Sequence, residues 1–216
     1  LRLIKSLYGL AVAPRLWFEH LTKALQSLGL RQSKFDQCLF YGTDILVGFH
    51  VDDAILVAKT PTLIDKLIEN LQKMGFELTK EESLCDYLGI QMARDDRKGT
   101  ITLTQTSLIE KIVRVTGLEG CKPNYVPAQQ QALGSDPDGQ PMQEKWGYSS
   151  VVGMLLYLST NTRPDITFAV SQVARFSSAP KQSHAQAVKT IVRYLSGTRD
   201  KGTVIKPNRN LTLDLY

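Results

Sequence analysis

The chain has few of the residues that mark a secreted, zinc-binding or membrane-spanning protein. It has three cysteines, Cys38, Cys85 and Cys121, which lie far apart and form no Cys-x-x-Cys pair. This spacing argues against a zinc knuckle and against a disulfide-stabilised fold, so we expect reduced thiols. The sequence has no uncharged apolar run of about 18 residues, and its N-terminus lacks the residue order of a signal peptide. We therefore expect an intracellular protein with no membrane span.

Composition and charge indicate a globular chain with a local excess of basic residues. Hydrophobic residues make up 43% and charged residues 22% of the 216 residues, enough for a core in one large domain or two small ones. Lysine and arginine number 26 against 21 acids, and eight of these basic residues lie within 175–209 beside one acid, Asp200. Such a cluster suits a polyanionic partner, although a solvated helix face explains it equally well.

Hydrophobic spacing and turn residues predict an α+β chain. Prolines around a glutamine tract predict a linker over 118–145. The other predicted elements, in chain order, are a helix over 14–28, a meander of strands over 38–41, 45–49 and 54–58, a helix between Pro61 and Gly75, a hairpin of 87–92 with 100–104, a helix over 107–115, helices over 146–159, 165–177 and 183–195, and strands near 204 and 211.

Both ends of the sequence read as interior parts of a longer polypeptide. The chain opens on the apolar-rich stretch LRLIKSLYGL without a methionine, and it closes on LTLDLY, which alternates like the first half of a strand. We therefore expect both ends to be cuts.

Two Asp-Asp pairs occur in different contexts. Asp95-Asp96 lies in a charged turn, where exposed turn carboxylates are a sufficient explanation. Asp52-Asp53 interrupts the apolar stretch 45–58, whose only other strongly polar side chain is that of His50. Two like charges crowded into an apolar setting cost several kcal/mol unless a cation compensates.

The second pair therefore predicts a divalent-metal site at a tight turn between two strands. Oxygen ligands select a hard ion such as Mg²⁺ or Mn²⁺. Two such ions, about 3.5 to 4 Å apart, commonly carry in-line phosphoryl displacement. The alternative is a hairpin tip that points two acids into water.

A longer pattern surrounds this pair. Five segments resemble, in family order and at family spacing along the full chain, the polymerase of copia-type long-terminal-repeat retrotransposons: SLYGLAVAPRLW at 6–17, FHVDDAILV at 49–57, YLGIQM at 87–92, GMLLYLSTNTRPDITFAV at 153–170 and IVRYLSGT at 191–198. The resemblance implies a reverse transcriptase, an RNA- and DNA-directed DNA polymerase released from a polyprotein. It further implies a fold of fingers, palm and thumb around metal-bound aspartates.

The resemblance also assigns roles to individual residues. Asp52 and Asp53 match the two aspartates of the family's YVDD turn, which implies that they are catalytic and hold Mg²⁺, with Mn²⁺ as a substitute. The remaining matched positions are Tyr8, Gly9, Pro14 and Arg15 beside the incoming nucleotide and template, His50 and Val51 near the primer end, and Leu88 and Gly89 in a hairpin similar to the primer grip, which places the primer 3′ hydroxyl near the metals.

The sequence departs from the family pattern at several points. His50 stands where the family usually has tyrosine, and Ala11 and Val12 replace a Lys-Gln pair, which removes a charge and an amide from the nucleotide's surroundings. The family's first metal-binding aspartate precedes SLYGL, and the first acid of its ribonuclease H domain follows a strand like LTLDLY. We therefore expect both acids to lie outside residues 1–216 and this chain alone to be inactive.

The same resemblance implies a domain layout and a set of partners. The layout is a partial fingers and palm over 1–93, a thumb-like hairpin and helix over 94–117, the linker over 118–145, and a connection over 146–216 that leads into a ribonuclease H domain. The implied partners are an RNA template, a DNA primer, their hybrid duplex, deoxynucleoside triphosphates and the remainder of the polyprotein. Replication in cytoplasmic virus-like particles is implied as well.

Two other function classes remain open. A non-catalytic nucleic-acid-binding remnant would use the basic segment and leave Asp52-Asp53 vestigial. A metal-dependent phosphatase or nuclease would need more histidine or aspartate ligands, and two of the three histidines, His20 and His184, lie in helical patterns where surface positions are expected.

Three further residues have structural interpretations. Trp17 and Phe18 are expected to be helix core residues and not base-stacking platforms. Asp165, which follows Arg163-Pro164, is expected to cap the following helix.

Overall fold

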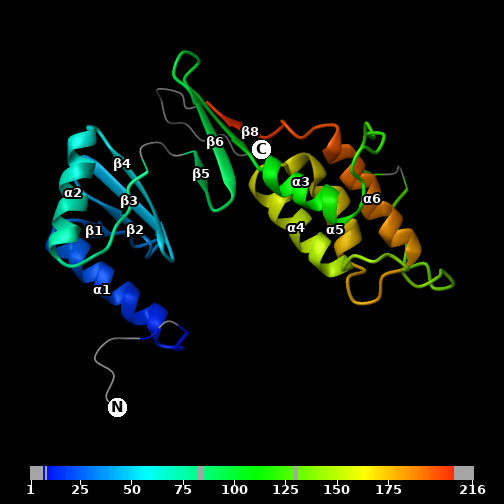
Figure 1. The fold of residues 1–216 in the computed structure, drawn as a ribbon, viewed down its shortest axis with the longest axis horizontal. Coiled ribbons are helices and arrows are strands. Elements are labelled where there is room, and N and C mark those ends of the chain that lie inside the picture. The colour runs from blue at the N-terminus through cyan, green and yellow to red at the C-terminus, as the bar shows by residue number, and fades with distance from the viewer. Residues whose placement is uncertain (1–6, 8, 82–84, 129–130, 207–216) are drawn as a thin grey trace. The chain divides into compact units, whose positions relative to one another are not determined.

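The structure, a computed structural model, describes residues 7, 9–81, 85–128 and 131–206, and the chain divides into two compact units, Leu1–Glu82 and Ser83–Tyr216 (Figure 1). Each unit combines one four-stranded antiparallel sheet with helices, which confirms the predicted α+β class. Within the described residues, no helix is both long enough and apolar enough to cross a bilayer.

In the first unit, two helices accompany a sheet whose strand order follows the chain. The elements are α1 (Ala13–Ser27), β1 (Arg31–Gln32), β2 (Leu39–Tyr41), β3 (Ile45–His50), β4 (Asp53–Ala58) and α2 (Pro61–Lys73). Pro14 and Pro61 lie in the first turns of the helices, where a missing backbone N–H has no cost. The predicted helices and meander are confirmed, and β1 adds a strand that the sequence did not indicate.

The core of this unit lies between the sheet and the helices. Along β3, Val47 and Phe49 are buried while Leu46 and His50 are exposed, so one face of the strand points into the core. The buried residues that meet this face come from both helices and from β2, and they include Leu21, Leu25, Phe40, Leu67 and Leu71.

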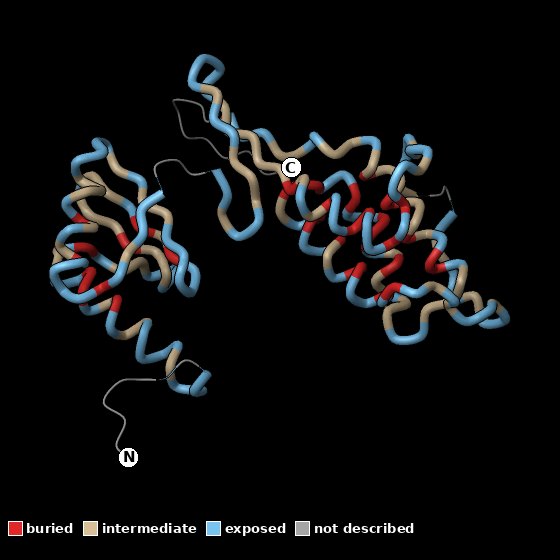
Figure 2. Tube along the Cα trace, in the orientation of Figure 1, coloured by how far each residue is buried: buried red, intermediate tan, exposed pale blue. Residues whose placement is uncertain are grey.

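In the second unit, a sheet is followed by a bundle of helices. The elements are β5 (Asp86–Tyr87), β6 (Ile90–Asp95), β7 (Thr100–Thr104), α3 (Thr106–Val115), α4 (Tyr148–Asn161), the 3₁₀ turn η1 (Pro164–Ile166), α5 (Thr167–Ala174), α6 (Gln182–Ser196) and β8 (Thr203–Ile205). Figure 2 shows buried residues gathered along the helices, where Ile109, Leu155, Val170 and Val188 form part of one apolar core. The predicted strand near 204 is β8, and the one near 211 lies outside the described residues.

The strand predicted over 87–92 is wrong in one respect. Leu88 and Gly89 have φ values of 54° and 74°, so the chain reverses there and separates β5 from β6. Two consecutive left-handed residues form the kind of tight turn that joins antiparallel strands. The pair Leu88-Gly89 therefore lies in a hairpin turn and not within a strand.

The compact units do not follow the predicted domain boundaries. The division falls between Glu82 and Ser83, so β5 and β6 belong to the second unit and the predicted boundary at 93–94 cuts through β6. The segment 118–145 is irregular, as its composition predicts, but its apolar residues pack on the helical core. Leu118 is buried there, and Cys121, Leu133 and Met142 contact the same cluster. Packing of these side chains makes the segment part of one unit and not a spacer between two.

His184 is buried, contrary to its predicted surface position. Its Nδ1 accepts the backbone N–H of Lys181 at 2.9 Å, which leaves Nε2 to donate to the carbonyl of Gly134 at 2.9 Å. The ring stacks on Phe176 with centroids 4.0 Å apart. The His184 ring thus joins the irregular segment to the start of α6.

Asp165 is also not the helix cap that the sequence predicts, because its carboxylate is held elsewhere. Arg163, whose side chain is 1% exposed, donates to both Asp165 oxygens at 2.9 and 2.7 Å and to the carbonyl of Thr198 at 2.8 Å. Tyr194 donates to the same carboxylate. Burial alone would raise the pKa of Asp165, but the hydrogen bonds from Arg163 and Tyr194 lower it overall. The network ties the turn after α4 to the end of α6.

Candidate active site

Asp52 and Asp53 lie at the tip of the β3–β4 hairpin. The two strands pair from Ile45 with Ala58 to His50 with Asp53, which leaves a two-residue loop of Val51 and Asp52. His50 and Asp53 are directly opposite each other, and their side chains share the exposed face of the sheet. The predicted tight turn between two strands is therefore present, and four of the predicted site residues lie together in it.

Val51 has an unusual backbone conformation. Its φ is 56°, in the left-handed region that a two-residue hairpin loop requires at its first position and that glycine or asparagine usually fills. A β-branched residue there is an outlier, which costs about 1–3 kcal/mol. Val51 is 61% exposed, so burial does not offset this cost.

Trp17 contacts this turn from α1. Its indole Nε1 donates to the carbonyl oxygen of Val51 at 3.1 Å. The ring meets Phe76 edge-on with centroids 5.7 Å apart, and His20 stacks on the same phenylalanine at 4.8 Å. Sequence analysis places Trp17 in the helix core, and helical spacing gives no sign of the hairpin that its N–H reaches. Phe18, in contrast, packs against the core and Phe49 as predicted.

The two carboxylates are open to solvent. Among the described residues, neither the Asp52 nor the Asp53 carboxylate has a hydrogen bond or an ion pair. Their oxygens are the donors that a hard divalent cation prefers. The described residues contain no group of three or more His, Cys, Asp or Glu side chains that could hold a metal ion. The pair thus fits Mg²⁺ as part of a ligand set, since six oxygen ligands complete its shell.

The predicted nucleotide-side residues lie around the start of α1. Gly9 has a φ of 95°, a conformation that glycine adopts without strain. Pro14 is in the first turn of the helix, and Tyr8 lies outside the described residues. Arg15 is exposed and donates to Glu19 at 2.8 Å, a hydrogen bond that raises the pKa of Arg15 and lowers that of Glu19. Arg15 thus points a guanidinium into solvent one turn before Glu19.

Leu88 and Gly89 belong to the second unit, where side chains from two elements hold their turn. The Asp86 carboxylate accepts the N–H of Gly89 at 3.1 Å and the amide of Gln91 at 3.2 Å. Tyr157 of α4 donates its hydroxyl to the carbonyl of Leu88 at 2.7 Å. The predicted primer hairpin is therefore anchored to the helical bundle.

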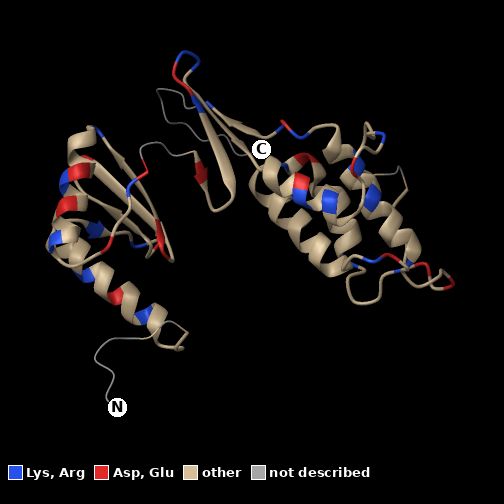
Figure 3. Ribbon diagram, viewed as in Figure 1, with Lys and Arg blue, Asp and Glu red and all other residues tan. Residues whose placement is uncertain are grey.

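Only part of the predicted basic segment is free to meet a polyanion. Lys189 is paired with Glu144 at 2.6 Å, a hydrogen bond that lowers the pKa of the carboxyl, and Lys181 donates to the carbonyls of Pro137 and Gly139. Arg193 of α6 has no ion pair among the described residues, and the same holds for Lys111 and Arg114 of α3. Figure 3 shows basic segments of α3 and α6, two helices that pack on each other. We call these three residues the basic face.

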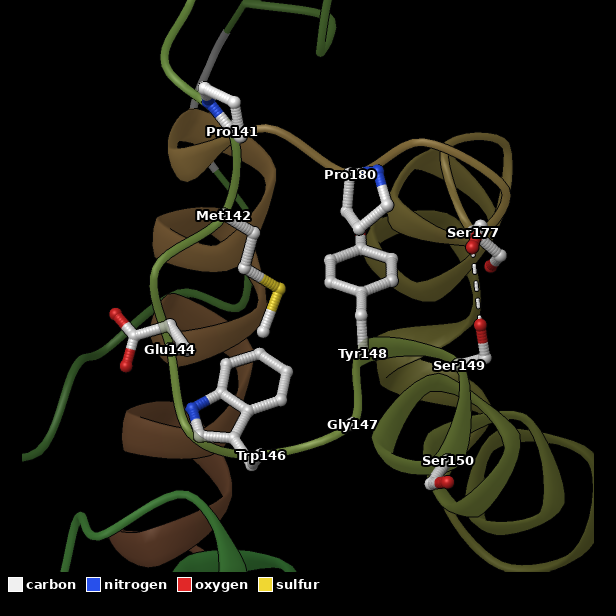
Figure 4. A pocket seen from close by; sticks show the side chains of 10 residues that line it. All are labelled: Pro141, Met142, Glu144, Trp146, Gly147, Tyr148, Ser149, Ser150, Ser177 and Pro180. Carbon is white, nitrogen blue, oxygen red and sulfur yellow. Dashed lines mark hydrogen bonds between the residues drawn. The ribbon is translucent and has the colours of Figure 1, made fainter.

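A separate cleft of about 460 Å³ lies at the start of α4 (Figure 4). Ser149 and Ser177 line one side of it, where the Ser149 hydroxyl donates to the carbonyl of Ser177 at 3.1 Å. Tyr148 donates its hydroxyl to the carbonyl of Val173, and burial raises the pKa of Tyr148 to about 12. The cleft contains none of the predicted site residues.

Comparison with known proteins identifies the family to which this chain belongs. A family model described as reverse transcriptase (RNA-dependent DNA polymerase) matches residues 1–130. Two "Retrovirus-related Pol polyprotein" sequences are each 33% identical: that of transposon RE1 from Arabidopsis thaliana over the whole chain, and that of transposon TNT 1-94 from Nicotiana tabacum over 91% of it. The chain spans 15% and 16% of those two polyproteins.

A shorter relative, the "Putative transposon Ty5-1 protein YCL074W" of Saccharomyces cerevisiae, is 26% identical over 98% of the chain and 69% of its own length. No solved structure matches the chain. Because the family model covers more than half of the 216 residues, and polyproteins of retrotransposons are similar along the chain, the chain belongs to the reverse transcriptase (RNA-dependent DNA polymerase) family.

Proposed function

We propose that this chain is part of an enzyme that copies an RNA template into DNA by two-metal nucleotidyl transfer, and that Asp52 and Asp53 hold the Mg²⁺ ions. The observation that carries the proposal is the β3–β4 turn, which presents two open carboxylates at the end of a hairpin whose only other strongly polar side chain is that of His50. Mn²⁺ would occupy the same oxygen ligands.

The residues of this chain would have different roles in the reaction. Bound Mg²⁺ would activate the attacking primer hydroxyl and stabilise the leaving group. Asp52 and Asp53 fix where that charge is placed, His50 and Val51 lie beside them, and the turn of Leu88 and Gly89 would orient the primer end. The remaining proposed contacts, to nucleotide and template, come from Tyr8, Gly9, Pro14 and Arg15.

The proposal includes a palm formed by the metal hairpin and its sheet, followed by thumb and connection elements in the second unit. The resemblance implies a third carboxylate, from a residue before SLYGL. Two carboxylates bind Mg²⁺ more weakly than three, so we expect little polymerisation by residues 1–216 alone. The substrates would be an RNA template, a DNA primer, their hybrid and deoxynucleoside triphosphates, and the rest of the polyprotein would supply the remaining parts in cytoplasmic virus-like particles.

A second candidate function is nucleic-acid binding without catalysis. The basic face of Lys111, Arg114 and Arg193 favours it, because unpaired cations neutralise phosphates regardless of sequence. Ala11, Val12 and His50 favour it as well, since they depart from the pattern at the proposed nucleotide and primer positions.

Primer extension on a primed RNA template separates the two functions. The assay compares this chain with a longer chain that includes the preceding polyprotein sequence, each with and without Asp52→Asn plus Asp53→Asn. Asp95→Asn plus Asp96→Asn is the matched control, because it makes the same change at the β6–β7 turn, and an asparagine at position 95 keeps an oxygen for the N–H groups of Arg97 and Lys98. We expect extension by the longer chain and a loss of at least about a hundredfold in the first double variant only. A folded longer chain that binds hybrid duplex without extending it would establish the second function instead.

A further inference from the structure

We propose that Trp17 is a positioning residue for the carboxylate turn, through its hydrogen bond to the backbone of Val51. This inference rests on the proposed function of Asp52 and Asp53. It adds a residue that would touch neither metal nor substrate and that would determine how the two carboxylates are held.

The hydrogen bond acts on the peptide unit that joins Val51 to Asp52. The carbonyl oxygen of Val51, which accepts the indole N–H at 3.1 Å, is in the same planar group as the backbone nitrogen of Asp52. Rotation of this group changes ψ of Val51 and φ of Asp52 together, and it would redirect the Asp52 side chain. A donor that is held in place and hydrogen-bonded to that oxygen opposes the rotation.

The conformation of Val51 makes such a restraint necessary. A valine with a φ of 56° gains free energy by returning to the β region, and the side chain has little burial to oppose that change. The hydrogen bond from Trp17, which comes from outside the hairpin, is made to the Val51 carbonyl in this conformation and therefore opposes its loss.

The donor itself is rigid. Trp17 lies in a fifteen-residue helix, and its ring packs edge-on against Phe76. Phe76 is buried, and the ring of His20 stacks on it as well. An aromatic side chain with so few rotatable bonds loses little entropy when it holds a hydrogen bond. The turn is thus connected to the helical layer of the unit at one point.

The test removes the donor and keeps the ring. Trp17→Phe retains contact with Phe76 and cannot donate, while β-(3-benzothienyl)alanine at position 17 replaces the N–H by sulfur in a side chain of nearly the same shape. Trp146→Phe, in the second unit, is the matched control. We would measure backbone amide order across β3 and β4 by ¹⁵N relaxation in the 216-residue chain, and then titrate with Mn²⁺ and follow paramagnetic broadening at Asp52 and Asp53.

We expect order to fall at residues 51–53 in both position-17 variants, while the rest of the hairpin is unchanged. The apparent Mn²⁺ affinity should fall about tenfold, as is typical when a group that orients a metal ligand is lost. Trp146→Phe should change neither quantity.

The outcomes distinguish this inference from the function on which it rests. Unchanged order at residues 51–53 in the benzothienyl variant overturns the positioning role, whatever the metal does. A wild-type chain that binds Mn²⁺ at Asp52 and Asp53 with the same affinity as both variants also overturns it, and leaves the proposed function intact. If backbone order at residues 51–53 falls as expected but Mn²⁺ broadens the signals of other residues, the positioning role is supported and the proposed metal site at Asp52 and Asp53 is wrong.

Discussion

The two hairpin turns that carry the predicted site residues are built alike and differ in what their carboxylates do. In each turn an apolar residue has a left-handed φ, 56° at Val51 and 54° at Leu88. In each, the carbonyl of that residue accepts a hydrogen bond from an aromatic side chain on a helix, Trp17 at 3.1 Å and Tyr157 at 2.7 Å. A left-handed apolar residue whose carbonyl is held by an aromatic side chain is thus found in both compact units, although only the second turn continues with another left-handed residue, Gly89.

The carboxylates beside these turns behave differently. Asp86 is engaged inside its own turn by the N–H of Gly89 and the amide of Gln91, so its charge is used to shape the backbone. Asp52 and Asp53 have no such partner among the described residues. An aspartate near a turn is therefore a candidate ligand only when the turn's own donors leave it free.

The largest expected effect concerns the carboxylates, which bind metal in the first turn and not in the second according to the proposal. Asp52→Asn plus Asp53→Asn should abolish Mn²⁺-dependent broadening in the β3–β4 turn, because no oxygen ligand of full negative charge remains there. Asp86→Asn should leave that broadening unchanged. Isothermal titration with Mn²⁺ provides a second measurement, and equal loss of binding in both variants would show that the two turns do not differ in this respect.

A smaller effect is expected at the aromatic donor of the second turn. Tyr157→Phe removes the hydroxyl that holds Leu88 and should lower the free energy of unfolding of the second unit by about 1 kcal/mol. Amide exchange at Gly89 should accelerate. In a chain that polymerises, the KM for primer–template should rise while the KM for nucleotide stays constant, because the turn would place the primer end.

Tyr125→Phe is the control for this variant, since Tyr125 is almost fully exposed. If Tyr157→Phe and Tyr125→Phe leave exchange at Gly89 equally unchanged, the hydroxyl does not restrain the turn.

The comparison also shows what the sequence can predict. Two apolar, β-prone runs and the break at Asp52-Asp53 between them predict the hairpin and the position of the carboxylates, since these depend on neighbours along the chain. The apolar residues around Leu88 predict a strand, whereas the chain reverses there because Leu88 and Gly89 are left-handed, and a leucine seldom adopts that conformation. Trp17, Tyr157 and His184 hydrogen-bond to backbone carbonyls that are 34, 69 and 50 positions away in the sequence, and spacing within their own helices gives no sign of those partners.

The smallest expected effect concerns the strain that both turns share. Val51→Gly and Leu88→Gly remove the steric cost of a left-handed φ but increase the entropy of the unfolded chain, and the difference should stabilise each unit by about 0.5–1 kcal/mol. The gain should be larger at Val51, which is β-branched and more exposed than Leu88. Val57→Gly, at an exposed position within β4, is the control and should destabilise by about 1 kcal/mol, because glycine weakens a strand. Native-state hydrogen exchange reports the two units separately, and a loss of stability at Val51→Gly equal to that of Val57→Gly would mean that the left-handed conformation stores no strain.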